Sequence, residues 1–284
     1  FIMIVWLASY PKSGNTWLRS LLANYYFSED GSFEFNLLKQ IDSFPSPRFF
    51  KNYPDKFDKP EDTAKYWITE QKKINKSNKI FFFKTHNSLC KINGNKFTNQ
   101  ENTLAAIYII RDPRNVITSI SHHFQVSLEE ALSFMKDKKR GIISYENNRY
   151  VGFQPLLSWD LHVKSWTDNS LYPTHIIRYE DLIADIDLTF EKLIKFIDKI
   201  TRSKKKFNKD KAKMCINNCD FSNLKKLEEQ NGFDESMTEK SSNKNLKFFN
   251  LGKDNNYKNI LPKEFITQIN NHYMNELIKF SYDI

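Results

Sequence analysis

The chain has 284 residues, of which 40% are hydrophobic and 15% aromatic, and it holds only 7 glycines. This composition excludes a disordered, collagen-like or low-complexity protein and indicates a chain that packs a sizeable core. The formal net charge of +9 favours anionic partners such as nucleotides or sulfated glycans, and a solvated lysine-rich surface explains it equally well. No arginine-rich tract or zinc-finger spacing indicates nucleic acid, so we expect no nucleic-acid partner.

Residues 2–9 form a near-continuous apolar run, which is typical of a parallel strand buried on both faces of a sheet. The run is too short to span a membrane, and it lacks the basic region of a signal peptide. Residues 17–27 then show helical spacing of apolar side chains, with Leu18 and Leu22 on one face. We therefore predict a strand, a short polar loop and a helix here, and no membrane span.

Residues 28–78 contain four prolines and several charge clusters, so we expect loops and short helices there, around a substrate entrance. Three more apolar runs predict strands at 79–86, 104–112 and 174–182, each followed by polar residues and a helical pattern. Strands that alternate with helices predict an α/β fold with a parallel sheet. We expect a single domain over residues 1–284, with a central, mostly parallel sheet flanked by helices and a P-loop-like nucleotide-binding architecture.

The remainder of the chain adds helices and polar segments. Residues 188–200 form an amphipathic helix pattern, and the charge run at 202–211 is typical of a solvated linker. Residues 232–256 are polar and predict a long surface loop.

Cysteine usage bears on compartment and metal binding. Cys90, Cys215 and Cys219 do not form a disulfide framework, and no neighbouring Cys or His group completes a metal site. We expect free thiols, no metal and a reducing, cytoplasmic compartment.

Polar residues follow each predicted strand, at 10–16, 85–87, 111–115 and 179–181. In open α/β sheets, ligands bind beyond the carboxyl ends of the strands. We therefore expect these four segments to meet around one ligand site.

The first of these segments reads "SYPKSGNTW" and lies between a strand and a helix. A nucleoside-triphosphate loop reads Gly, four residues, Gly-Lys-Ser/Thr, whereas here Lys12 precedes the glycine, Gly14. A helix N-terminus, a lysine and the side chains of Ser13, Asn15 and Thr16 suit a phosphate or sulfate group. The alternative is an ordinary loop with an exposed lysine.

The third segment reads "RDPRNVITS" and places Arg111 at a strand end and Ser119 on the following helix. An arginine there can pair with a dianion through its planar fork. The alternative is a structural salt bridge, for example with Asp112.

Together, "SYPKSGNTW" and "RDPRNVITS" resemble the two cofactor motifs of the sulfotransferase family. That family transfers the sulfuryl group of 3′-phosphoadenosine 5′-phosphosulfate (PAPS) to a hydroxyl or amine. The resemblance implies that the first motif holds the 5′-phosphosulfate and the second the 3′-phosphate, through Arg111 and Ser119. The segment "FKTHN" is similar to the family's "KTH", which implies that His86 is the general base, with Lys84 beside the reaction centre.

The resemblance also implies a role for the residues around the donor. Lys12 neutralises charge on the leaving oxygens, and Trp17 stacks on adenine. The residues expected to bind the donor are Lys12, Ser13, Gly14, Asn15, Thr16, Trp17, Arg111, Ser119, Tyr179, Phe221 and Gly252. The remaining histidines, His122, His123, His162, His175 and His272, are expected to be structural.

The C-terminal motif departs from the family pattern, which is roughly Arg-Lys-Gly. Gly252 matches, but Asn250 and Leu251 stand at the positions of the two cations. Lys253 or Arg114 could supply the missing charge.

The mechanism expected from the resemblance is in-line attack by the acceptor, with His86 near its ordinary pKa of about 6.5. Two other functions stay open at this point: a nucleotide-dependent phosphotransferase, and a non-catalytic glycan- or nucleotide-binding protein on the same fold. The sequence does not identify the acceptor, which can be a small molecule or a glycan, and it does not indicate an oligomeric state.

Overall fold

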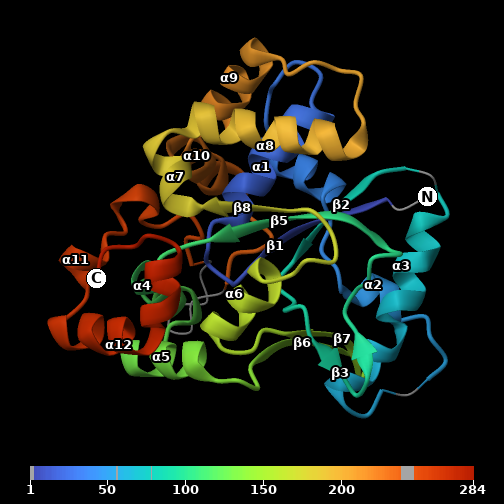
Figure 1. The fold of residues 1–284 in the computed structure, drawn as a ribbon, viewed down its shortest axis with the longest axis horizontal. Helices are drawn as coiled ribbons and strands as arrows, with labels where there is room; N and C mark the ends of the chain where they lie inside the picture. Colours follow the sequence, from blue (N-terminus) through green and yellow to red (C-terminus); the bar gives the residue numbers. More distant parts are fainter. Residues whose placement is uncertain (1–2, 56, 78, 238–245) are drawn as a thin grey trace.

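The protein is described by a computed structural model that covers residues 3–55, 57–77, 79–237 and 246–284. Its centre is a parallel sheet in the order β2-β1-β5-β8 (Figure 1). The strands are β1 (Ile4–Ser9), β2 (Phe81–Thr85), β5 (Thr103–Ile110) and β8 (Thr174–Arg178). The predicted α/β class is confirmed, and each predicted strand is present. The last one is shorter than predicted, because residues from Tyr179 onward form a helix.

The position of β1 inside the sheet explains why its sequence is apolar. It pairs in parallel with β2 on one side and β5 on the other, so that Ala8 lies opposite both Thr85 and Tyr108. All six of its residues are buried. Val5 and Leu7 face one core, while Trp6 and its neighbours of the same parity face the other.

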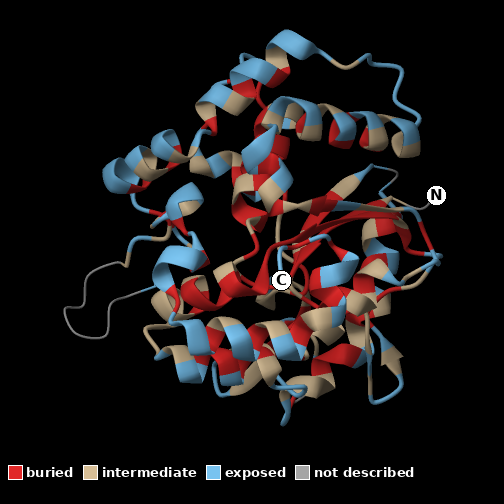
Figure 2. Ribbon diagram, turned by 60° about the vertical axis from the view of Figure 1, so that its left-hand side comes forward, coloured by how far each residue is buried: buried red, intermediate tan, exposed pale blue. Residues whose placement is uncertain are grey.

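Helices cover both faces of the sheet (Figure 1). On one face lie α1 (Asn15–Phe27), α7 (Tyr179–Ala184), α8 (Ile186–Thr201), α9 (Lys209–Asn218) and α10 (Phe221–Asn231). On the other lie α3 (Trp67–Asn75), α4 (Pro113–Phe124), α5 (Leu128–Lys136), α6 (Trp159–Thr167) and α12 (Lys263–Lys279). The buried residues form a continuous band through the strands and the inner helix faces (Figure 2).

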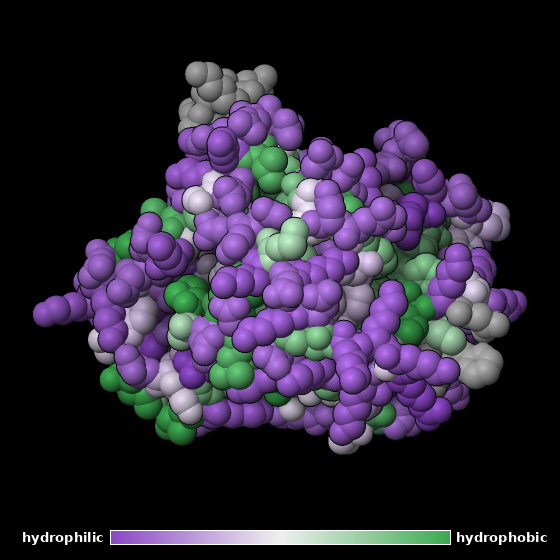
Figure 3. Space-filling view, turned by 90° about the horizontal axis from the view of Figure 1, so that it is seen from above, coloured by the Kyte–Doolittle hydropathy of each residue, from purple (hydrophilic) through white to green (hydrophobic). Residues whose placement is uncertain are grey.

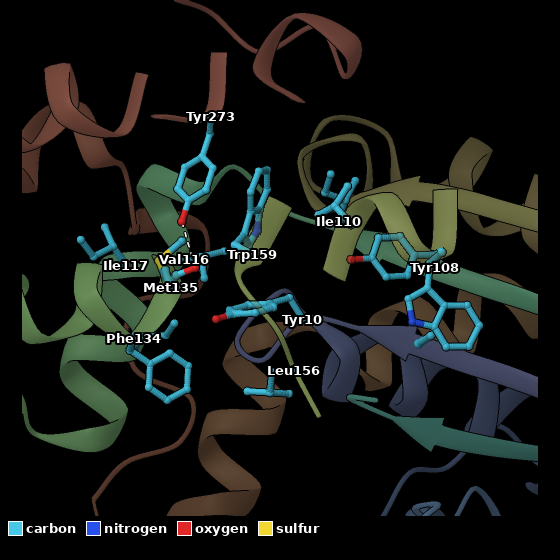
Figure 4. Packing of buried hydrophobic residues seen from close by; sticks show 14 of the residues in the cluster. Tyr10, Tyr108, Ile110, Val116, Ile117, Phe134, Met135, Leu156, Trp159 and Tyr273 are labelled. Atoms are coloured by element: carbon cyan, nitrogen blue, oxygen red, sulfur yellow. Dashed lines mark hydrogen bonds between the residues drawn. The ribbon is translucent and has the colours of Figure 1, made fainter. Parts of the chain in front are cut away.

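The larger of the two cores holds the end of β1 in place. Figure 4 shows Tyr10 among Phe134, Leu156 and Trp159, and all four side chains are buried. Tyr273 of α12 closes this cluster by donating a hydrogen bond to the carbonyl oxygen of Met135, at 3.0 Å. The loop that follows Tyr10 therefore starts from a rigid position.

Between the sheet strands, the connections differ from the simple alternation that the sequence predicts. A short hairpin, β3 (Lys91–Ile92) with β4 (Asn95–Lys96), links β2 to β5 without a helix, and a second hairpin, β6 (Gly141–Glu146) with β7 (Arg149–Pro155), precedes α6. The segment before β2 contains short helices as predicted: η1 (Phe35–Gln40), α2 (Pro47–Phe50) and η2 (Pro60–Tyr66). Near the C-terminus, η3 (Gly252–Asp254) and α11 (Tyr257–Ile260) precede α12.

The surface above α8 and α9 is dominated by hydrophilic side chains (Figure 3). The segment that joins these helices exposes Lys204, Lys205 and Lys206, in agreement with the predicted solvated linker. The linker is shorter than the predicted range 202–211, because α9 begins at Lys209. Among the residues described, no helix combines the length and the apolar character needed to cross a membrane.

Candidate active site

A cavity of about 690 Å³, called the main cavity below, lies at the carboxyl edge of the sheet. The four predicted strand-end segments contribute to its wall, together with the start of α10 and residues 248–252. Every predicted site residue except Ser13 lines it. These are Lys12, Gly14, Asn15, Thr16, Trp17, Lys84, His86, Arg111, Ser119, Tyr179, Phe221 and Gly252.

The loop between β1 and α1 is shaped by its backbone. Lys12 and Gly14 both adopt positive φ angles, of 66° and 97°. A Cβ atom at Gly14 would lie 2.4 Å from a ring carbon of Tyr179, so the position requires glycine for space as well as for conformation. The side-chain amide of Asn15 donates to the carbonyl oxygen of Leu7 at 3.0 Å and to Ser9 Oγ at 3.1 Å. Asn15 thus fastens the helix start to β1, and the first backbone N–H groups of α1 remain without intrahelical partners.

Lys12 stands in an electropositive part of the main cavity. Its Nζ lies 4.1 Å from the ring centroid of Phe248. Burial, and next the charges of Arg111 and Lys84, lower the pKa of Lys12 to about 7. A bound anion would favour its protonated form.

Arg111 links the first loop to α4. Its Nη1 donates to the carbonyl oxygen of Lys12 at 3.1 Å and to Ser119 Oγ at 3.3 Å, and its guanidinium lies 4.3 Å from the ring centroid of Tyr179. The alternative salt bridge with Asp112 is not formed, because Asp112 pairs with Arg114 at 2.7 Å. Arg111 Nε and Ser13 Oγ are buried without a partner. Arg111 lines the main cavity and Ser13 does not, so it is the orphaned donor of Arg111 that fits an anionic ligand there.

Aromatic side chains border the space between these two loops. The ring centroids of Trp17 and Tyr179 are 5.7 Å apart, and Trp17 Nε1 donates to the carbonyl oxygen of Cys219 at 2.9 Å. Phe221 packs directly on Gly252, where an added Cβ would lie 2.7 Å from the phenyl ring. Flat rings that are held in this way suit a planar heterocycle.

His86 follows β2 and is held by three elements. Its backbone N–H donates to Gln154 Oε1 at 3.0 Å, and its carbonyl oxygen accepts from His162 Nε2 at 3.1 Å. Its Nδ1 lies 2.8 Å from the carbonyl oxygen of Ser9, which can only accept. The proton of the neutral ring is therefore on Nδ1, and Nε2 is the basic nitrogen.

The acidity of His86 differs from the sequence-based expectation. Burial, and next the charge of Lys84, lower its pKa to about 3. The ordinary pKa of about 6.5 is therefore wrong for this site, since the sequence does not show that the ring is enclosed beside an ammonium group.

Residues 248–255, called the C-terminal wall below, lack the two cations that the family pattern has at positions 250 and 251. Asn250 and Leu251 line the main cavity, so these two positions are retained while their charges are not. Arg114 does not compensate: its side chain is 1% exposed, paired with Asp112 and packed 4.2 Å from the ring centroid of Tyr257. Lys253 is exposed.

Several residues at the site were not predicted from the sequence. Asn255 donates to Ser119 Oγ at 2.9 Å and accepts from Thr118 Oγ1 at 2.7 Å, which attaches the C-terminal segment to α4. His122 and His123, expected to be structural, also line the main cavity. Within the described ranges, no group of three or more His, Cys, Asp or Glu side chains is arranged to hold a metal ion.

Glu235 is the most consequential of these additions. Its carboxylate accepts from Arg19 at 2.6 Å, from Lys84 at 2.8 Å and from Thr16 Oγ1 at 3.4 Å. The sequence carries no signal for Glu235, which belongs to a polar segment far from β1 and β2. Arg19 lies one helical turn after Thr16, which is the one hint that it points toward the site.

Comparison with known proteins shows the family to which the chain belongs. The family profile described as sulfotransferase domain matches residues 4–281. The Arabidopsis thaliana protein named Cytosolic sulfotransferase 14 is 23% identical over 228 residues, which cover 78% of this chain and 61% of the relative. The chain thus spans about three fifths of the length of that curated relative.

Solved structures share the fold. Retinol dehydratase in complex with androsterone and the inactive cofactor PAP superposes with a TM-score of 0.60 at 16% identity, covering 96% of this chain and 80% of the other. Mouse sulfotransferase SULT7A1 complexed with PAP gives a TM-score of 0.58 at 15% identity, covering 97% and 84%. Because the family profile spans nearly all of the described residues, the chain belongs to the sulfotransferase domain family.

Proposed function

We propose that this protein is a PAPS-dependent sulfotransferase, formed by one domain over residues 1–284, that transfers the sulfuryl group to a hydroxyl, or an amine, of a small and largely apolar acceptor. The observation that carries the proposal is the meeting of Lys12, His86 and Arg111 in one cavity. A phosphate-binding loop alone would serve many nucleotides, and a buried histidine alone is usually structural.

The donor would lie along the carboxyl edge of the sheet. Lys12, Thr16 and the N-terminus of α1 suit the 5′-phosphosulfate, while Arg111 and Ser119 suit the 3′-phosphate. The unpartnered Arg111 Nε is a donor that such a ligand would satisfy. Trp17, Tyr179 and Phe221 would enclose the adenine. That related folds were solved with PAP supports this arrangement.

The proposed chemistry depends on His86 and two lysines. Bound PAPS supplies a sulfuryl group whose bond to the phosphate oxygen breaks as the acceptor oxygen bonds to sulfur. His86 takes the acceptor proton on Nε2, because its Nδ1 proton is committed to Ser9. Lys12 and Lys84 stabilise negative charge on the peripheral and leaving oxygens.

The acceptor class follows from the other part of the wall. Besides the polar residues, the main cavity is lined by Phe124, Leu128, Ile142, Met237 and Phe248. Such a wall favours an apolar body that bears a single reactive hydroxyl over a polysaccharide. The free cysteines, and the name of the cytosolic relative, support a cytoplasmic location.

Radiolabelled PAPS tests the proposal directly. We expect transfer of label to at least one member of a panel of phenols, aliphatic alcohols and amines, and no transfer of phosphate from ATP. Binding of adenosine 3′,5′-bisphosphate (PAP) without any transfer would instead support a non-catalytic binding protein. Transfer from ATP would support a phosphotransferase.

Calorimetry tests the placement of the donor. Arg111→Ala should weaken PAP binding by a factor of roughly 10 to 100, as expected for charged hydrogen bonds, and leave adenosine 5′-monophosphate nearly unaffected. Equal weakening of both ligands would reject the assignment of Arg111 to the 3′-phosphate.

A further inference from the structure

Glu235 forms a partition between two cavities. It lines the main cavity and also a second cavity of about 350 Å³, which Arg19 lines as well. One carboxylate oxygen, Oε1, accepts from Arg19, and the other, Oε2, accepts from Lys84 and Thr16. The carboxylate thus connects a residue outside the main cavity to two residues within it.

Arg19 holds the carboxylate of Glu235 from a buried position. It lies on α1, its side chain is 5% exposed, and its ion pair with Glu235 spans 2.6 Å. Because α1 begins directly after the loop from Tyr10 to Gly14, Arg19 is fixed to the helix whose N-terminus would hold the 5′-phosphosulfate. Glu235 is therefore positioned by α1 even though it lies more than two hundred residues later in the chain.

Lys84 needs such a partner. Its side chain is 12% exposed, and burial lowers the pKa of its ammonium group, whereas the charge of Glu235 raises it. In the described part of the chain, Glu235 is the acid with which Lys84 forms its ion pair, at 2.8 Å. Without it, the long side chain would lose its direction and its charge would be disfavoured.

We propose that Glu235, anchored by Arg19, is a positioning residue that holds the ammonium group of Lys84 in the main cavity beside the reaction centre. The inference rests on the proposed function, since it assumes that Lys84 acts on the transferred group. It adds two residues, Arg19 and Glu235, to which the cofactor motifs assign no role.

Two effects of Glu235 can be separated because they act in opposite directions. Its negative charge repels an anionic ligand, so Glu235→Gln should bind PAP as tightly as the wild type or more tightly. If Glu235 also positions Lys84, the same variant should lose turnover. We expect kcat to fall about 10- to 100-fold, the value of a lost charged hydrogen bond, with Glu235→Asp restoring part of it.

The test combines a mutant cycle with a readout that needs no donor. In the cycle, Lys84→Met and Lys84→Met/Glu235→Gln should have the same kcat, because the carboxylate acts through Lys84. Independently, the rate at which an amine-reactive reagent labels Lys84 against pH reports its pKa, which should fall in Glu235→Gln. Asp234→Asn, which removes the exposed neighbouring acid, should change neither quantity.

The proposal is overturned if Glu235→Gln keeps its kcat and only binds PAP more tightly. Glu235 would then repel the anionic ligand without positioning Lys84. Additive losses in the cycle would overturn it as well. Should Glu235→Gln fail to fold, Arg19→Met removes the anchor instead. Because the charge of Arg19 itself lowers the pKa of Lys84, this variant is judged by kcat, which should fall, and an unchanged kcat would overturn the proposal. If the wild type transfers no sulfate, the proposed function fails, while the labelling experiment still decides whether Glu235 holds Lys84.

Discussion

The two walls that would hold the donor are built in different ways. On one side, the loop from Tyr10 to Gly14 is fixed by a buried tyrosine, by two positive φ angles and by the Asn15 amide bonded to β1. On the other side, residues 248–255 are held by side chains of two helices: the backbone N–H groups of Phe248 and Phe249 donate to the carboxylate of Glu228 on α10, and Asn255 is hydrogen-bonded to α4. The first wall carries the cations Lys12 and Arg111, whereas the second presents Asn250 and Leu251.

This difference indicates how the site divides its tasks. The rigid wall provides charge and position for the reacting groups, where a displacement of about 1 Å can cost roughly 100-fold in rate. The C-terminal wall contributes shape, through Gly252 against Phe221, and contributes little charge. We therefore expect substitutions on the rigid wall to affect catalysis, folding and most of the donor affinity, and substitutions on the C-terminal wall to change donor affinity alone and by a smaller factor.

The largest effect is expected at His86, beside the rigid wall. His86→Ala should lower kcat by a factor of roughly 10²–10⁴, the usual contribution of a positioned general base, with PAP affinity retained. His272→Ala, on the exposed surface of α12, serves as the control. Near-normal turnover of His86→Ala with an aliphatic alcohol would show that the base is another residue.

The pH profile sharpens the same prediction. Because burial and Lys84 lower the pKa of His86 to about 3, its neutral form persists in the folded enzyme well below pH 6.5. Measured as kcat/KM for the donor, which reports the free enzyme, the rate should therefore not fall between pH 8 and about 5.5 through titration of His86. In the unfolded chain the ring is protonated below its ordinary pKa, so stability should decrease as pH falls through this range, and rates should be measured where the fold is intact.

The comparison also shows which features the sequence could reveal. The strands and the loop "SYPKSGNTW" are local patterns, so the sheet and the positions of Lys12 and Gly14 followed from them. Glu235, Asn255 and the two hairpins depend on contacts between segments that are far apart in the chain, which no local pattern encodes. The pKa of His86 likewise depends on its enclosure, so its shift appears only once the fold is known.

A smaller effect on stability is expected at Gly14. Gly14→Ala should destabilise the fold by about 1–3 kcal/mol for the left-handed backbone, and further because the new Cβ meets Tyr179. Gly94→Ala is the matched control, since Gly94 also has a positive φ, of 81°, but no atom lies within 4 Å of an added Cβ. Thermal unfolding should show the larger loss for Gly14→Ala. Equal losses would indicate that backbone conformation alone explains the glycine.

A more modest effect concerns the proton on Lys12. Its pKa is lowered to about 7 in the free protein, and an anionic ligand should raise it. PAP binding should therefore take up a proton above pH 7, and affinity should weaken by up to tenfold per pH unit as the pH rises from there. Calorimetry in two buffers of different ionisation enthalpy measures the uptake. Lys12→Arg, which stays charged, should lose this dependence, and a wild type without proton uptake would contradict it.

The smallest effect is expected from restoring charge to the C-terminal wall. Asn250 lines the main cavity where the family pattern has a cation, so Asn250→Arg should tighten PAP binding about fivefold, the value of a partly exposed charge pair of about 1 kcal/mol. Affinity for adenosine 5′-monophosphate should stay the same, because the gain depends on the 3′-phosphate. Asn259→Arg adds the same charge on an exposed part of α11 and controls for long-range attraction. Lys253→Asn completes the experiment. If Lys253 already neutralises the 3′-phosphate, Lys253→Asn should weaken PAP binding, and Asn250→Arg in the protein that keeps Lys253 should give no gain. An unchanged affinity of Lys253→Asn would show that Arg111 and Ser119 bind that phosphate without help from the C-terminal wall.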